Sequence, residues 1–222
     1  MPGEAFDIHY SDNTTPRKVG RSTIRNKLVA SEMGREFYDG ARENGYGGYR
    51  YDGRWKRLWP KLIQRYGLTV QSSVLDVGCK KGFALVDLRE LLPGITVRGI
   101  ELTHYPLDCA PSEVRQFLSR GSYASLPFGA GSFDFVLAWA SIYVQNLAGV
   151  VETLREIQRV SNGRAYVSVG AYETAEDREL FSRWSLLGCT VLHVDEWPEV
   201  FAYAGYTGDW HFTTAKSLNL IA

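Results

Sequence analysis

VLDVGCKKGF, residues 74–83, is an apolar run followed by an acidic residue and two glycines four positions apart. This pattern is typical of a β-strand that ends in a ligand-binding turn before a helix, because Gly78 and Gly82 let a ligand approach the backbone. The turn matches neither GxxxxGK(S/T) nor GxGxxG, the two common phosphate-binding patterns. A carboxylate at Asp76 would also repel a phosphate and attract a cation. The stretch therefore predicts a ligand that carries a positive group.

Strands and helices alternate along the chain around this turn. We expect strands at 73–78, 96–102, 132–140 and 164–170, and helices at 83–92, 111–118 and 150–160. The alternation predicts βαβ units, and hence a parallel sheet with helices on both faces. Ligands of such sheets bind beyond the carboxyl ends of the strands. The last fifty residues predict two helices and then a closing pair of strands, at 173–187, 195–206, 207–215 and 217–221.

The first 66 residues differ in composition from the rest. We expect a tail that is loose or ordered by a partner up to about residue 22, then a weakly signalled surface helix at 22–37 and a glycine- and tyrosine-rich loop at 38–55. Residues 55–66 carry apolar side chains at helical spacing. Between residues 17 and 65 there are 13 Lys or Arg against 5 Asp or Glu, although the whole chain has no net charge. Such an excess could hold an anionic ligand or nucleic acid, or simply pack on an acidic body.

The composition, 45% hydrophobic and 23% charged, is that of a folded protein. No apolar run reaches the roughly 18 residues of a membrane span, and the first residues lack the basic-then-apolar layout of a signal peptide. The three cysteines are far apart and form no metal-binding spacing. We therefore expect a cytoplasmic protein with no membrane partner and no bound metal.

Four segments resemble the class I S-adenosylmethionine-dependent methyltransferases. VLDVGCKKG is similar to their first motif, (D/E)xGxGxG, and GIEL (99–102) to their second strand, whose terminal acid is Glu101 here. Residues 122–138 resemble an LPF…SFDxV region, and residues 154–169 an EixRVLkpGG helix and strand of methyltransferase type 11 and 25 domains. The flanking YDGRW (51–55) and GYTGDW resemble motifs of a less characterised bacterial group that acts on small molecules.

The resemblance implies an α/β fold of the Rossmann-like, doubly wound type. Its mostly parallel sheet would have seven strands, with helices on both faces and an N-terminal lid of helices and loops. Residues 1–66 would form the tail and the basic lid arm, and residues 67–222 the domain that binds S-adenosylmethionine.

The resemblance also assigns cofactor contacts to Asp76, Gly78, Cys79, Gly82, Glu101, Leu102, Ser122, Tyr123 and Ala138. Glu101 would accept hydrogen bonds from the ribose hydroxyls, whereas Ser122 stands where many relatives have an Asp that binds adenine. Lys80 replaces the central glycine of the motif. We expect a negative φ at Lys80, and we expect Lys80 and Lys81 to be solvated. The alternative is that the two lysines neutralise the cofactor carboxylate.

The sequence defines the site of the methyl acceptor less closely than the cofactor site. Lid arms of related enzymes fold over the cofactor, which implies substrate contacts from Tyr46, Tyr49, Arg50 and Arg54. The resemblance also implies that Trp139, just past a strand, lies beside the reacting methyl group. Aromatic faces suit a cationic sulfur, and guanidinium groups grip carboxylates or phosphates; ordinary packing of the arm is the alternative. His104 and Tyr143 rank first as a catalytic general base, because both follow strand ends on the ligand side. Three further candidates are His9, His193 and His211.

These observations predict a methyltransferase whose cofactor is S-adenosylmethionine and whose acceptor is a small molecule, with an anionic group favoured by the basic arm. One alternative is an RNA or protein methyltransferase. The neutral overall charge and the absence of an RNA-binding motif disfavour nucleic acid. Another alternative is a non-catalytic sensor or partner subunit that binds the cofactor, which Lys80 and the missing adenine Asp keep open. A homodimer is left open.

Overall fold

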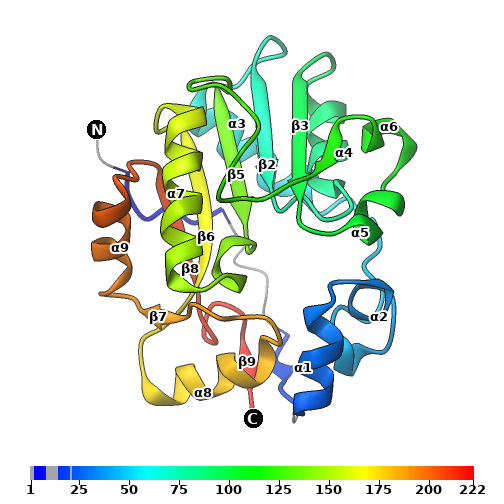
Figure 1. Cartoon of the computed structure of the whole chain (residues 1–222), viewed down its shortest axis with the longest axis vertical. Helices are drawn as coiled ribbons and strands as arrows, with labels where there is room; N and C mark the ends of the chain where they lie inside the picture. The colour runs from blue at the N-terminus through cyan, green and yellow to red at the C-terminus, as the bar shows by residue number, and fades with distance from the viewer. Residues whose placement is uncertain (1–2, 9–14, 21) are drawn as a thin grey trace.

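The computed structural model describes residues 3–8, 15–20 and 22–222, and within these ranges seven strands form one open sheet (Figure 1). The strands run parallel in the order β4-β3-β2-β5-β6, and β6 pairs along its other edge with both β7 and β8. Their bounds are β2 Ser73–Val77, β3 Thr96–Glu101, β4 Leu118–Arg120, β5 Phe135–Trp139, β6 Ala165–Tyr172, β7 Leu192–His193 and β8 Asp209–Thr213. The predicted α/β class and parallel sheet are confirmed.

Helices cover both faces of this sheet. The main ones are α3 Trp55–Tyr66, α4 Phe83–Leu91, α7 Leu147–Ser161, α8 Ala175–Trp184 and α9 Trp197–Ala204. Side chains alternate along each strand. Leu75 and Val77 of β2 therefore pack with α7 and α9, whereas Val74 packs with α3 and α4. Two buried hydrophobic clusters hold the sheet from its two sides.

The register of the central strands places the acidic residue of the first motif between two neighbours. Asp76 lies opposite Gly99 of β3 and Leu137 of β5. It therefore stands near the carboxyl end of the central strand, where ligands of parallel sheets bind.

Two expectations about local structure were wrong. The helix expected at 111–118 is only α6 Ser112–Arg115, because the chain then joins the sheet as β4, where Leu118 pairs with Gly99. A short helix that was not expected, α5 His104–Asp108, precedes it. The expected closing strands do not pair with each other, since β8 pairs with β6 and β9 Leu220–Ile221 pairs with β1 Arg17–Lys18.

Residues 3–8 are docked on the edge strand β8, and residues 15–20 contain β1, which pairs with β9 in a separate two-stranded sheet. Ile8 is fully buried, and the Phe6 amide donates a hydrogen bond to the Trp210 carbonyl at 2.8 Å. The expectation of a loose tail is therefore wrong for residues 3–8 and for β1. After it come α1 Ile24–Ser31, α2 Arg35–Tyr38 and the 3-10 helix η1 Arg42–Asn44. Helix α2 lies next to α5, and α1 packs with α2 and η1 (Figure 1). Over the described residues, the structure contains no helix that is long and apolar enough to span a membrane.

Candidate active site

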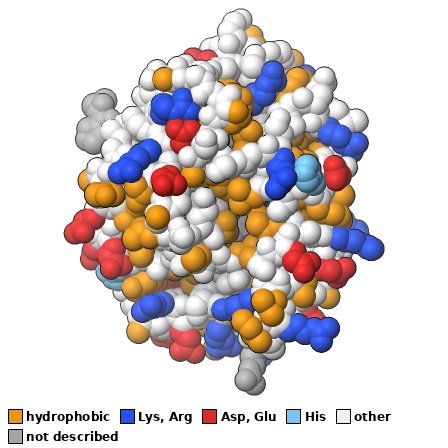
Figure 2. Space-filling view, in the orientation of Figure 1, with side chains coloured by type: hydrophobic (Ala, Val, Ile, Leu, Met, Phe, Trp, Pro, Cys, Tyr) orange, Lys and Arg blue, Asp and Glu red, His pale blue; other side chains and the backbone are white. Residues whose placement is uncertain are grey.

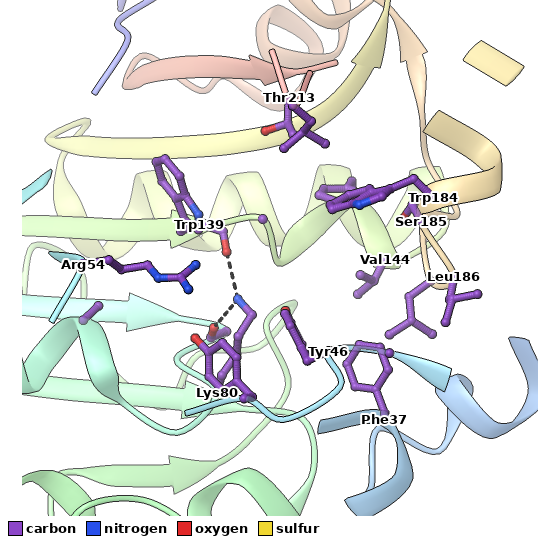
Figure 3. Close-up of a pocket in the computed structure, with 18 of the residues that line it drawn as sticks. Phe37, Tyr46, Arg54, Lys80, Trp139, Val144, Trp184, Ser185, Leu186 and Thr213 are labelled. Atoms are coloured by element: carbon purple, nitrogen blue, oxygen red, sulfur yellow. Dashed lines mark hydrogen bonds between the residues drawn. The ribbon is translucent and has the colours of Figure 1, made fainter. Parts of the chain in front are cut away.

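A cavity of about 770 Å³ lies at the carboxyl ends of β2 and β5 (Figure 3). The strand ends and their turns form one wall. The opposite wall comes from residues 37–58 and from residues 184–187 after α8. On the outer surface, hydrophobic side chains gather across the middle of the face shown in Figure 2, between charges of both signs.

The turn after β2 is held by close backbone packing. Gly78 has a φ of +83°, and its amide and the Cys79 amide both donate to the Ile100 carbonyl. A Cβ at Gly78 would lie 2.1 Å from the Cβ of Ser141. The Ser141 hydroxyl in turn donates to the Val77 carbonyl at 2.6 Å. Glycine is therefore required here for the approach of the loop after β5 as well as for the turn itself.

Lys80 points into the cavity, contrary to the expectation of a solvated side chain. Its φ is +54°, so the expected negative φ is also wrong. The Lys80 amide donates to Oε2 of Glu101 at 2.9 Å, which holds the backbone in this left-handed conformation. Its Nζ donates to the carbonyls of Trp139 at 3.1 Å and Gly78 at 3.4 Å (Figure 3).

Lys81 points the other way and fastens the arm. Its side chain is almost fully buried and donates to both carboxylate oxygens of Asp39, at 2.7 and 2.8 Å, and to the Tyr49 carbonyl at 2.9 Å. Tyr105 of α5 donates to the same carboxylate. Burial alone would raise the pKa of Asp39, but hydrogen bonds from Lys81 and Tyr105 and the charge of Lys81 outweigh it and lower that pKa. The expected solvation of Lys81 is therefore wrong.

Replacing Lys81 with methionine should loosen the arm. We expect a loss of about 2 kcal/mol in the free energy of unfolding, between the values typical of exposed and of buried ion pairs, because Asp39 is partly exposed. Trypsin should also cut the arm faster, as limited proteolysis would show. The matched control is Lys56→Met, which breaks the exposed pair of Lys56 with Glu90 and should change little. Equal effects of the two changes would contradict a fastening role for Lys81.

Asp76 is a buried carboxyl group on the wall of the cavity. It is 4% exposed, and burial raises its pKa to about 7; the charge of Lys80 lowers the pKa and that of Glu101 raises it. Among the described residues, no group donates a hydrogen bond to this carboxyl. A buried carboxylate without donors favours a cationic partner.

Glu101 is enclosed by protein donors. The Leu102 amide and the Tyr123 hydroxyl donate to its Oε1 at 2.6 and 2.9 Å, and the carboxylate is 1% exposed. Tyr38 of the arm is also 1% exposed. Its ring stacks on the ring of Tyr105 in α5. Burial raises the pKa of Tyr38, and the charge of Glu101 adds to this rise. Glu101 is not part of the cavity wall, because Tyr123 and Tyr38 cover that end.

Residues 75–168 match a protein family described as a methyltransferase domain. This segment, under half of the chain, holds the motifs that resemble class I S-adenosylmethionine-dependent methyltransferases. A curated relative, the malonyl-[acyl-carrier protein] O-methyltransferase of Legionella pneumophila, is 27% identical over 151 residues, which cover 65% of this chain and 52% of the relative. The chain thus spans about half the length of that relative.

Three solved structures show the same fold as this chain. The YcgJ protein of Bacillus subtilis has a TM-score of 0.52 at 19% identity, with 65% of this chain and 66% of that chain covered. The methyltransferase bound to the Trm112 activator in Haloferax volcanii has a TM-score of 0.51 at 21% identity, covering 81% and 75%. The [4+2]-cyclase SpnF has a TM-score of 0.53 at 18% identity, covering 86% and 75%. Because one of these proteins is a cyclase, the shared fold does not by itself define the reaction.

The fold brings about half of the predicted site residues to the cavity. Those that line it are Asp76, Gly78, Cys79, Tyr46, Tyr49, Arg54, Trp139 and Tyr143. Others lie outside its lining, namely Gly82, Glu101, Leu102, Ser122, Tyr123, Ala138, Arg50 and His104. The ring of Trp139 packs between Trp55 and Tyr166, so this residue offers the cavity mainly its carbonyl.

The two candidate bases are placed differently. His104 is exposed at the start of α5, away from the cavity. Tyr143 is 5% exposed on the cavity wall, and burial raises its pKa to about 12. Its phenol therefore stays neutral near pH 7 and can act there only as a hydrogen-bonding group. His193 and His211 do not line the cavity, and His9 is outside the described residues.

The sequence did not single out Arg17 as a cavity residue, whereas Arg42 was a candidate for gripping an anion together with Arg50 and Arg54. Arg17 and Arg42 line the cavity together with Arg54 and Lys80. Burial lowers the pKa of Arg17, and the charges of Arg54 and Arg42 lower it further. Arg17 reaches the site through the pairing of β1 with β9, for which no short-range pattern exists.

The acceptor groups on the cavity wall fit the ammonium group at the methionine end of S-adenosylmethionine. Two strand-end carbonyls and the Asp76 carboxyl form an electronegative recess, and the Lys80 ammonium is a stand-in cation within it. The groups that would receive the adenosine end, Glu101 above all, are covered by Tyr38 and Tyr123. Among the described residues, no group of three or more His, Cys, Asp or Glu side chains could hold a metal ion.

Proposed function

We propose that this methyltransferase transfers a methyl group to a small-molecule acceptor that carries an anionic group. The observation that supports the anionic group is the gathering of Arg17, Arg42 and Arg54 on one side of the cavity, close enough for Arg54 and Arg42 to lower the pKa of Arg17. Asp52 balances part of this positive charge, because it pairs with Arg54 at 2.6 Å, and a bound anion would balance the charge of Arg17 and Arg42. Guanidinium groups also match the geometry of carboxylates and phosphates.

The size and the remaining walls of the cavity favour a small, partly apolar acceptor. A volume of about 770 Å³ is within the range of small-molecule sites. Opposite the guanidinium groups, the wall is apolar and consists of Phe37, Val144, Trp184, Leu186, Leu187 and Leu218. An acceptor with an apolar body and one anionic end would be complementary to both walls.

We assign the following roles to residues of the chain. The cofactor, when bound, supplies an activated methyl group on a sulfonium. Asp76 and the carbonyls of Gly78 and Trp139 would hold its ammonium group. The arm over residues 1–66 would close the cavity as a lid and exclude water, and residues 67–222 would form the catalytic domain. Methyl transfer needs a nucleophile held at near-attack distance more than it needs an acid. Tyr143 would orient the acceptor by a hydrogen bond.

The test measures transfer of a labelled methyl group from S-adenosylmethionine to pairs of low-molecular-weight aromatic and aliphatic acids and their neutral amides. We expect the acids to be methylated and their amides to react at least about tenfold more slowly, because a charge-assisted bidentate bond is lost. Equal rates for acids and amides would contradict the anionic acceptor. Transfer to RNA that falls steeply with salt would favour the nucleic-acid alternative instead.

Replacing Arg17 or Arg54 with alanine should raise the acceptor KM about tenfold and change kcat by less than about threefold, since the lost interaction is the same in ground and transition states. Two matched controls are Lys18→Ala, next to Arg17 in β1, and Arg50→Ala in the arm. Both control residues are exposed and outside the cavity lining. An unchanged KM in Arg17→Ala, or an equal rise in the controls, would refute the assignment.

A further inference from the structure

The first motif of this chain holds a positive charge of its own at the ends of the two central strands. The Nζ of Lys80 lies 3.1 Å from the Trp139 carbonyl at the end of β5 and 3.4 Å from the Gly78 carbonyl just after β2 (Figure 3). Asp76, two residues before Gly78, lines the same cavity. The two carbonyl oxygens form a site for an ammonium group, and the Asp76 carboxyl lies on the wall of the same cavity.

The direction of Lys80 is fixed by its backbone. The left-handed φ of +54° is costly for a residue with a side chain, and the bond from its amide to Glu101 maintains it. The next lysine, with the same chemistry, turns to Asp39 on the arm. The turn therefore separates two adjacent lysines, and it directs only Lys80 into the cavity.

We infer that the Lys80 ammonium competes with the amino group of S-adenosylmethionine for this carbonyl site, so that Lys80 determines the affinity for the cofactor. The inference rests on the proposed use of the Asp76 recess. The cofactor carries an ammonium and a sulfonium, and a third positive charge in the same partly buried recess would be repelled. The cofactor therefore binds only when Lys80 withdraws, and its affinity is reduced by the free energy of that withdrawal.

Lys80→Met is the test variant, because methionine has a similar length, keeps the left-handed strain of a residue with a side chain and removes the charge. Calorimetry at pH 8 would compare two ligands. S-adenosylhomocysteine, which has the amino group, should bind about tenfold more tightly to the variant, the change expected when one charge repulsion is removed. 5′-Methylthioadenosine, which lacks the amino-acid part, should change by less than about twofold.

Lys27→Met is the matched control, since Lys27 is exposed in α1 and outside the cavity lining. It should leave both dissociation constants unchanged. Lys80→Gln gives a second neutral side chain and should follow Lys80→Met, and thermal melting of each variant would show that it is folded.

An unchanged or weaker affinity of Lys80→Met for S-adenosylhomocysteine would overturn the inference. A weaker affinity would indicate that Lys80 pairs with the cofactor carboxylate instead. An equal gain for 5′-methylthioadenosine would also overturn it, because that result would indicate a looser arm. If the folded wild type and both Lys80 variants bind no S-adenosylhomocysteine, the proposed cofactor site fails together with the inference. If the wild type binds and the variants gain nothing, only the inference fails.

Discussion

Gly78→Ala should abolish most cofactor binding and lower the free energy of unfolding by about 3 kcal/mol, the sum of overpacking and left-handed strain. The added Cβ would lie 2.1 Å from the Cβ of Ser141 and 2.7 Å from its hydroxyl oxygen. Ser141 has little freedom to move away, because it is 5% exposed and bonded to the Val77 carbonyl. The loop after β5 must therefore shift. That shift would move the Trp139 carbonyl away from the carbonyl of Gly78, and the two would no longer bind one ammonium group.

Urea denaturation and calorimetry with S-adenosylhomocysteine would measure the two effects of Gly78→Ala. Gly205→Ala is the matched control, because Gly205 has a similar φ of +71° and no atom within 4 Å of the added Cβ. Gly205→Ala should lower the free energy of unfolding by only about 1 kcal/mol, because it adds left-handed strain without a clash. Adding Ser141→Gly to Gly78→Ala should restore part of the stability. If Gly78→Ala and Gly205→Ala lower the free energy of unfolding equally, the contact of the added Cβ with Ser141 does not destabilise the fold.

The central sheet was predictable because its signals are local. The apolar runs of β2, β5 and β6 are bounded by turn residues, and strands of this kind are recognised without knowledge of the partner strand. The pairing of β9 with β1 was not predictable, since about 200 residues separate the two strands and neither exceeds two residues. Arg17 could not be assigned to the site for the same reason.

The two lysines of the first motif show a different limit. Sequence indicates which residues follow a strand but not where their side chains point. At Lys80 the direction depends on a backbone bond to Glu101, 21 positions away, and at Lys81 on an ion pair with Asp39, 42 positions away. The positive ligand expected from Asp76 rests on a local property, namely an acid at a strand end, and its burial and raised pKa agree with that expectation.

Asp76→Asn is expected to weaken the binding of S-adenosylhomocysteine about 30-fold at pH 8, within the range for losing a bond between charged groups. The same change should stabilise the protein at that pH. The pKa of Asp76 is raised to about 7 in the fold by burial, against about 3.9 when unfolded. The fold therefore favours the protonated acid, and its contribution to stability is full below pH 4 and is lost as the pH rises to 7. The free energy of unfolding lost in this way is a few kcal/mol, which corresponds to a pKa difference on the order of 3 units. Asp76→Asn avoids this loss because asparagine does not ionise.

Melting temperatures and dissociation constants of the wild type and Asp76→Asn, measured from pH 5 to pH 8, would separate these effects. Wild-type affinity should rise with pH as Asp76 ionises, whereas that of Asp76→Asn should stay flat. Asp134→Asn, just before the neighbouring strand β5, is the control of opposite sign. Hydrogen bonds from the Ser73 amide and hydroxyl lower the pKa of Asp134, so its carboxylate stabilises the fold above pH 4 and loses that effect in acid. Asp134→Asn should therefore melt lower at pH 8 and bind the ligand normally. If Asp76→Asn also melts lower at pH 8 and binds as the wild type does, Asp76 is a structural group and does not hold the cationic end of a ligand.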